Sequence, residues 1–469
     1  MKQTILFMAT ALLVITGCRK IEMDGGTTIN PNPAPTPGVE NTILEGRIKV
    51  NTTLKANYTY KLRGLVYVTE GAILTIEPGT KIVGELNKAG GLVITRGSKI
   101  IADGTADKPI VFTSESPNPQ RGDWSGVVLL GQAPTNASFN GQTGVGEIEG
   151  GINNADGLGL YGLGSSSNPA DNSGILRYVR IEYAGYAFLP DKEINGLTFG
   201  GVGNGTVVDY VQVSYANDDS FEWFGGTVNC KHMISFRTLD DDFDTDNGFQ
   251  GKVQFGIALR DSAVADISKS EAFESDNDAN GSTLLPQTNA VFSNMTVLGP
   301  KAQLNNKGNS LFLCGAQIRR NSSISIMNSI IAGWPQGLLI DASKGTPTDL
   351  NITAATPSLY VQNTIIAGCT APVKYAPSTT APTGATDASI LSWFNTAANG
   401  NAILDNNSDV ALGDPFNYSS PDFNPTAASP AKSGAAFGNP KLNAWFTPVA
   451  YIGACAPGDT WWKSWTKFN

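Results

Sequence analysis

The chain repeats short strand-like phrases at intervals of about one coil of a solenoid. Residues 175–184 (ILRYVRIEYA) return as 207–216 (VVDYVQVSYA), and residues 328–333 (NSIIAG) return as 363–368 (NTIIAG). A strand-rich unit that recurs at a fixed spacing buries its apolar face only by stacking on the next unit, so this pattern predicts a solenoid. Such a scaffold offers one long lateral face, which suits chain-like ligands.

Other β-branched runs broken by glycine support the same architecture. Residues 65–76 are followed by a similar run at 91–102, and further strand patterns lie at 110–113, 124–130, 228–236, 252–259, 290–298, 322–331 and 358–366. No amphipathic helical pattern of twelve or more residues interrupts them after residue 42, which excludes βαβ architectures. An all-β solenoid is expected, with a sandwich or propeller as the alternative. Asn294, Asn328 and Asn363 recur before apolar strands, which predicts an asparagine ladder whose amides bond from coil to coil.

Four phrases carry a family resemblance: 74–80 (LTIEPGT), 104–113 (GTADKPIVFT), 122–126 (GDWSG) and 363–368 (NTIIAG). They resemble phrases of right-handed parallel β-helix proteins of the pectate-lyase-like class, which are common among bacterial surface lipoproteins of uncharacterised function. The resemblance covers roughly residues 45 to 440 and implies the fold. It brings no catalytic residues, because these phrases are strand and corner signals and a fold does not determine a function.

The first eighteen residues predict the subcellular location of the protein. Lys2 precedes a short apolar run at 5–15, and Ile15-Thr-Gly-Cys18 follows. The run is too short for a membrane-spanning helix. The ending resembles the lipobox of bacterial lipoproteins, which implies a signal peptide at 1–17 and lipidation of Cys18. Residues 18–41 are then a lipidated, proline-rich linker. The acidic residues after Cys18 loosely resemble a surface-export signal, so we expect an outer-membrane protein, lipid-anchored and facing the cell exterior.

Composition limits the partners and the chemistry. Without residues 1–17, 31 basic residues face 41 acidic ones, and this acidic balance argues against nucleic acid and against any membrane contact other than the lipid anchor. His232 is the single histidine, it lies between Cys230 and Met233, and we expect it to be a packing residue. Cys230, Cys314, Cys369 and Cys455 lack a paired zinc-ligand spacing, and we expect buried thiols rather than metal ligands.

Two excursions and an aromatic tail complete the predicted β-helix at 42–440. Residues 132–174 hold acidic side chains but no strand-length apolar run, and residues 337–400 are similar apart from the strand at 358–366. Long loops of this kind are disordered or functional. Residues 441–469 concentrate tryptophan and phenylalanine. We expect them to form an aromatic C-terminal cap over the apolar cross-section at the open end of the solenoid, with a sugar-stacking platform as the alternative.

Candidate site residues concentrate in three segments that align on a central phenylalanine: 219–224 (DSFEWF), 241–246 (DDFDTD) and 271–276 (EAFESD). If each segment opens one coil, Phe221, Phe243 and Phe273 stack inward. The alternation of side chains along a strand then places carboxylates together on the outer face. The residues of this predicted column are Glu222, Asp244, Asp246, Glu274 and Asp276.

Stacked carboxylates repel one another unless a cation or a proton intervenes, so three readings compete with a plain solvated acidic face. The column can bind calcium, which takes six to eight oxygen ligands. Two carboxylates can act as acid and base on a glycosidic bond. A lyase can use calcium with a nearby base such as Lys252, Arg260 or Lys269, although nothing in the sequence fixes one of them in that role.

The function expected from these features is binding of polysaccharide or of another envelope component by a surface lipoprotein. A calcium-dependent polysaccharide lyase or glycoside hydrolase is the first alternative. An accessory subunit of an outer-membrane uptake complex is the second, with the long loops as docking elements.

Overall fold

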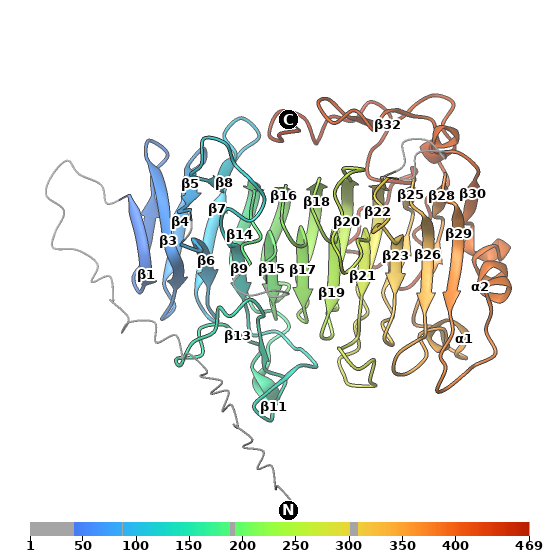
Figure 1. Ribbon diagram of the computed structural model, residues 1–469, viewed down its shortest axis with the longest axis horizontal. Coiled ribbons are helices and arrows are strands. Elements are labelled where there is room, and N and C mark those ends of the chain that lie inside the picture. The colour runs from blue at the N-terminus through green and yellow to red at the C-terminus, as the bar shows by residue number, and fades with distance from the viewer. Residues whose placement is uncertain (1–41, 87, 188–192, 301–307, 469) are drawn as a thin grey trace, which may run out of the picture.

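The computed structural model describes residues 42–86, 88–187, 193–300 and 308–468, which form a right-handed parallel β-helix (Figure 1). The predicted signal peptide, the linker at 18–41 and Cys18 lie outside the described residues. Within the described ranges, no helix is long and apolar enough to cross a membrane.

The parallel strands stack into three ladders, one for each side of the coil. The first ladder comprises β2 (Thr52–Leu54), β4 (Ile73–Ile76), β7 (Lys99–Asp103), the first halves of β14 (Gly174–Glu182), β16 (Val207–Ser214), β18 (Asn229–Phe236), β20 (Lys252–Leu259) and β22 (Val291–Leu298), then β24 (Ser325–Met327) and β27 (Val361–Gln362). The second comprises the first halves of β1 (Ile43–Ile48) and β3 (Thr59–Val68), then β5 (Lys81–Gly84), β8 (Ile110–Ser114), the second halves of β14 to β22, β25 (Ile330–Ala332), β28 (Ile365–Ala367) and β30 (Ala402–Leu404).

The third ladder carries the candidate site. After the second halves of β1 and β3 it comprises β6 (Gly91–Ile94), β9 (Gly126–Leu130), β15 (Leu197–Gly200), β17 (Phe221–Phe224), β19 (Phe243–Asp246), β21 (Phe273–Ser275), β23 (Cys314–Ile318), β26 (Gln336–Asp341) and β29 (Ala371–Ala376).

The register confirms the repeats seen in the sequence. Ile175 pairs with Val207, and Ile330 pairs with Ile365, so each repeated phrase lies directly on its copy in the next coil. Phe221, Phe243 and Phe273 are fully buried and stack as predicted, with ring centroids 5.7 and 5.5 Å apart. Cys230, Cys314, Cys369 and Cys455 are buried thiols, as expected.

The turn between the first two ladders uses a left-handed residue in consecutive coils. These residues have φ between 49° and 64°, and they are Tyr178, Tyr210, His232, Phe255, Asn294, Asn328 and Asn363. Asparagine tolerates this conformation, whereas the aromatic residues gain ring stacking from it. His232 lies 4.2 Å from the ring of Tyr210 and 5.1 Å from that of Phe255, and its Nδ1 is 2.7 Å from Oδ1 of Asp209. The histidine is therefore a packing residue, as expected.

The asparagine ladder differs from the prediction. Asn328 donates from Nδ2 to Oγ of Ser293 on the preceding coil, but it also pairs with the backbone of Ala436 through both its Nδ2 and its Oδ1. Asn294 donates from Nδ2 to the carbonyl of Tyr451. The amides of Asn294 and Asn328 therefore hold the C-terminal segment against the turn.

The C-terminal segment runs back along the side of the β-helix (Figure 1). It includes β31 (Leu412–Asp414), β32 (Asp422–Pro425) and the 3₁₀ turns η3 (Asn407–Val410) and η4 (Pro430–Lys432). Trp465 is fully buried with its ring at right angles to those of Tyr178 and Tyr210, 5.8 and 6.0 Å away. The predicted aromatic cluster is present, and the surface that it covers is the lateral turn rather than the open end of the solenoid.

The excursion at 132–174 packs on the outer face of the third ladder. It contains the short hairpins β10 (Ser138–Phe139) with β11 (Gln142–Thr143) and β12 (Gly146–Glu147) with β13 (Leu160–Tyr161), and the turn η1 (Gly164–Ser166). Ile148, Ile152 and Tyr161 join Phe224 in an apolar cluster there. This contact places Glu149 near the acidic strands.

The tract at 337–400 is more regular than expected. It contains most of β26 and all of β29, which complete two coils, together with α1 (Leu350–Thr353), α2 (Asp387–Phe394) and η2 (Ala397–Asn399). The expectation of a loop interrupted by a single strand is therefore wrong. Gly337 and Pro372 fall within these two strands, and both residues conceal the strand pattern.

Candidate functional site

Three of the five predicted carboxylates lie in register on the outer face of the third ladder. Glu222 pairs with Asp244 and Asp244 with Glu274. The column of acids is bounded by Thr198 on one side and Gln317 on the other. Glu222 is only 4 % exposed and the other two are partly buried, so this is not a freely solvated acidic face.

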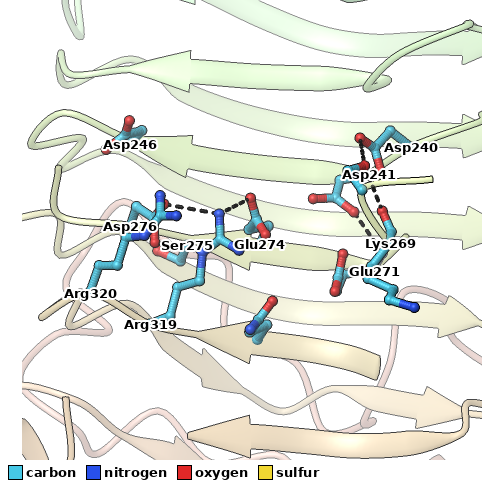
Figure 2. A network of polar contacts seen from close by, with 12 residues as sticks. Asp240, Asp241, Asp246, Lys269, Glu271, Glu274, Ser275, Asp276, Arg319 and Arg320 are labelled. Carbon is cyan, nitrogen blue, oxygen red and sulfur yellow. Dashed lines mark hydrogen bonds and ion pairs between the residues drawn. The ribbon is translucent and has the colours of Figure 1, made fainter. Parts of the chain in front are cut away.

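Two arginines neutralise one end of this column. Arg319 donates from Nε to Oδ1 of Asp276 at 2.8 Å and from a terminal nitrogen to Glu274, and Arg320 also pairs with Asp276. Figure 2 shows both guanidinium groups gathered with Glu274 and Asp276. Asp246 lies at the same end of the strands and uses its carboxylate on the backbone of Asn247. Internal cations therefore compensate Glu274 and Asp276.

The opposite end has a ladder of side chains at the turn before each strand. Oδ1 of Asn195 accepts the backbone N–H of Asp219 at 3.2 Å. Oδ1 of Asp219 accepts the N–H of Asp241 at 2.7 Å, and Oδ1 of Asp241 accepts that of Glu271 at 2.6 Å. Each side chain thus fixes the turn of the next coil, and each aspartate uses one oxygen for it.

Seven carboxylates lie close together around these turns. Three overlapping groups have ligand oxygens within 4.8 Å of one another: Asp218 with Asp219 and Asp240, Asp219 with Glu222 and Asp244, and Asp240 with Asp241 and Glu271. Among the described residues, none of the seven forms an ion pair with lysine or arginine. Arg260, which is fully buried, pairs with Asp242 at 3.3 Å and donates to the carbonyls of Leu239 and Asp240.

A cavity of about 350 Å³ opens beside this group. Its lining contains carboxylates from separate parts of the chain, because the excursion brings Glu149 and the turns of successive coils bring the others. The lining residues are Glu149, Glu193, Asn217, Asp218, Leu239, Asp240, Asp266, Ile267 and Ser268.

Burial and mutual repulsion raise the pKa values of these carboxyl groups. Burial, with the charge of Asp266, raises the pKa of Asp240 to about 7. Burial, with the charge of Glu274, raises the pKa of Glu271 to about 8. At the other end, burial raises the pKa of Glu274 to about 7 although Arg319 opposes the shift. These groups change protonation near neutral pH, which ordinary exposed carboxyls do not.

A mixed aromatic and cationic surface adjoins the cavity. Tyr183 and Tyr215 are left-handed residues between the second and third ladders, and their partly buried rings stack 5.0 Å apart. The guanidinium groups of Arg121 and Arg237 each lie 5.4 Å from the ring of Tyr215. Two residues after Tyr215 and Arg237, the chain reaches Asn217 and Leu239 in the cavity lining. We refer to Arg121, Tyr183, Tyr215 and Arg237 as the Tyr–Arg surface.

The alignment predicted that Glu222, Asp244 and Glu274 share one column, which the strand register confirms, but it missed much of their surroundings. An acidic residue stands two positions before each aligned phenylalanine: Asp219, Asp241 and Glu271. The alignment therefore already contained these turn residues. Arg319, Arg320 and Glu149 come from distant segments, and no local pattern indicates them. The arrangement that results can bind a cation, exchange protons near neutral pH, or contact a ligand lying across the cavity.

The pectate-lyase-like β-helix domain model matches residues 46–407. Neither the curated proteins nor the solved structures contain a match to this chain. The family match spans most of the sequence and agrees with the three parallel ladders seen in the structure. This chain therefore belongs to the family of pectate-lyase-like β-helix domain proteins.

Proposed function

We propose that the protein is a surface lipoprotein that binds polysaccharide along the side of its β-helix. The Tyr–Arg surface carries this proposal. A tyrosine ring has an apolar face and a polar edge, which matches the mixed apolar and hydroxylated faces of a pyranose ring. Arg121 donates to the carbonyl of Ala216 and Arg237 pairs with Asp261, and the remaining N–H groups of both guanidinium groups are hydrogen-bond donors beside that ring.

The rigid scaffold supports binding of a chain-like ligand. Stacked coils hold Tyr183, Tyr215 and Arg237 at equivalent turn positions, so successive contacts have a fixed spacing. Preorganised groups lose little conformational entropy when a ligand binds. The proposed anchoring in an outer membrane rests on the lipobox-like segment ending at Cys18, and the outward orientation rests on Lys20, Glu22 and Asp24, which loosely resemble a surface-export signal.

Affinity electrophoresis tests this function. Gels cast with a neutral glucan or with an acidic polysaccharide are expected to retard the parent protein in at least one case. Tyr215→Ala and Arg121→Gln should lose that retardation, whereas Arg177→Gln, a partly exposed arginine on the first ladder, should keep it. A parent that migrates unretarded in every gel, and instead co-purifies with an envelope protein, contradicts polysaccharide binding.

The proposed lipid anchor at Cys18 has its own test. Cys18→Ser is expected to abolish incorporation of labelled palmitate and to leave the chain in the soluble fraction. Undiminished labelling of this variant contradicts lipidation at Cys18.

A polysaccharide lyase or hydrolase is the second candidate, and one observation favours it. Asp240 lines the cavity with a pKa raised to about 7 by burial, and Asp218 lies close beside it. A carboxyl group that is protonated near neutral pH next to a second carboxylate has the properties of a general acid and its partner. New reducing ends or an ultraviolet-absorbing unsaturated product, both lost in Asp240→Asn, would establish catalysis in place of simple binding.

A further inference from the structure

The turn before each acidic strand carries more negative charge than its structural role requires. Asn195, Asp219 and Asp241 perform the same task, which is to accept the backbone N–H of the next coil. Asn195 does this with a neutral amide while only 1 % exposed. The charges of Asp219 and Asp241 are therefore not required for this hydrogen bond, and burying them without a counter-ion is unfavourable.

Glu271 provides a second and independent observation. Its side chain is 2 % exposed, and its Oε1 is buried without a hydrogen-bond partner among the described residues. The carboxylates of Asp240, Asp241 and Glu271 approach within 4.8 Å of one another. Oδ1 of Asp240 is also buried without a hydrogen-bond partner in the described part of the chain. The carboxyl groups of Glu271 and Asp241 also contact each other. Buried polar atoms normally have partners, so these oxygens require either a shared proton or a ligand.

The two ends of the acidic strands differ in how their charge is compensated. Arg319 and Arg320 serve Glu274 and Asp276, and Figure 2 shows them on the side away from Asp241 and Glu271. Within the described ranges, Asp240, Asp241 and Glu271 have no such partner. Their compensation must come from protons shared between carboxyls or from an ion that enters from the cavity.

We propose that Asp240, Asp241 and Glu271 bind a calcium ion at the inner side of the cavity. Two oxygens that coordinate one calcium at 2.3–2.6 Å lie at most about 5 Å apart, and the three carboxylates meet this limit. Calcium takes carboxylate oxygens in flexible geometry and completes its shell with water. The cavity beside Asp240 has room for that water.

This site differs from the calcium column expected from the sequence. Glu274 and Asp276 are engaged by arginines, and Asp246 lies at their end of the strands. Glu222 and Asp244 belong to the neighbouring group with Asp219. The proposed ion therefore lies at the turn before the strands. It does not depend on polysaccharide binding, which the Tyr–Arg surface carries.

Isothermal titration calorimetry with calcium chloride on the chelator-treated full chain tests the proposal. The parent should bind calcium saturably. Asp241→Asn should bind at least about tenfold more weakly, because one ligand charge is lost. This variant keeps the Oδ1 acceptor for Glu271, as Asn195 does for Asp219, so an unchanged near-ultraviolet circular dichroism spectrum is expected.

Glu271→Gln gives a second variant with the same expected loss, and Glu274→Gln is the matched control at the arginine-paired end, expected to bind like the parent. A parent that does not bind calcium at millimolar concentration overturns the proposal and leaves shared protons as the compensation. Calcium binding that survives both Asp241→Asn and Glu271→Gln overturns it equally.

Discussion

The backbone N–H of Glu271 donates a hydrogen bond of 2.6 Å to Oδ1 of Asp241, which brings together two acidic side chains from consecutive coils. The turn thus holds like charges side by side in a place where both are almost completely buried. This relationship connects the fold to the proposed chemistry, because the same hydrogen bond that sets the coil register also positions the carboxylates.

The protonation of these buried groups predicts how stability depends on pH. Burial raises the pKa values of Glu271 and Asp246 to about 8 and that of Asp240 to about 7. The folded state therefore binds more protons than the unfolded state above about pH 4, and the free energy of unfolding falls as pH rises through these pKa values. Thermal melts in chelator should show a midpoint that decreases between about pH 5 and pH 8.

Calcium should reduce that decrease, because an ion bound only by the native state stabilises it by mass action. The same melts repeated with millimolar calcium provide the comparison. A midpoint that stays constant or rises with pH in chelator contradicts the assignment of buried, proton-binding carboxyls.

Replacing Arg319, which pairs with Glu274 and Asp276, should destabilise the protein. Arg319→Gln leaves the partly buried Glu274 and the buried Asp276 with less compensation, and a loss of roughly 3 kcal/mol is expected from chemical denaturation. Adding Glu274→Gln should restore part of the stability, because it removes one uncompensated charge. Arg177→Gln breaks the exposed pair with Asp103 and should change stability by less than about 1 kcal/mol. Equal effects of the two single substitutions contradict this reading.

The phenylalanine stack predicts a large core effect. Phe243 is fully buried between Phe221 and Phe273, so Phe243→Ala should cost about 3–5 kcal/mol and broaden the unfolding transition, since neighbouring coils share their stability. Val207→Ala, at a residue 37 % exposed, is the control and should change stability by about 0.5 kcal/mol or less. Denaturant titration measures both variants. If Phe243→Ala unfolds like the parent, the inward stack is wrong.

The C-terminal segment should be integral to stability. Trp465 is fully buried against Tyr178 and Tyr210, so Trp465→Ala is expected to lose about 3–5 kcal/mol and to increase proteolysis of the C-terminal segment. Trp445 is partly exposed and contacts Lys231, and Trp445→Ala should have a much smaller effect. Similar losses in both variants indicate that the cluster does not hold the segment through Trp465.

Most of the fold could be predicted because its information is local and repeated. The two-residue alternation of β17, β19 and β21 and the recurring phenylalanine specify which side chains face inward, and the structure confirms them. The strand β29 was missed because Pro372 interrupts its pattern, and the register of its coil depends on its neighbours.

The candidate site was less predictable, since its decisive contacts are not local. Arg319 reaches Glu274 from another coil, and Glu149 reaches the cavity through an excursion that packs on Phe224. The role of Asp241 depends on which backbone N–H its Oδ1 accepts, and only the stacked coils show that. Sequence spacing therefore located the acidic strands. The structure was needed to separate Glu274 and Asp276, which pair with arginines, from Asp240, Asp241 and Glu271, which form no ion pair among the described residues.

Crystallographic analysis of the protein grown with calcium, with anomalous scattering used to identify the ion, tests the central claim most directly. We predict an ion peak coordinated by Asp240, Asp241 and Glu271, at oxygen distances of about 2.3–2.6 Å, with water completing its shell from the cavity. Carboxylates that contact one another directly, with no peak between them at saturating calcium, would contradict the claim and show that shared protons compensate the buried charge.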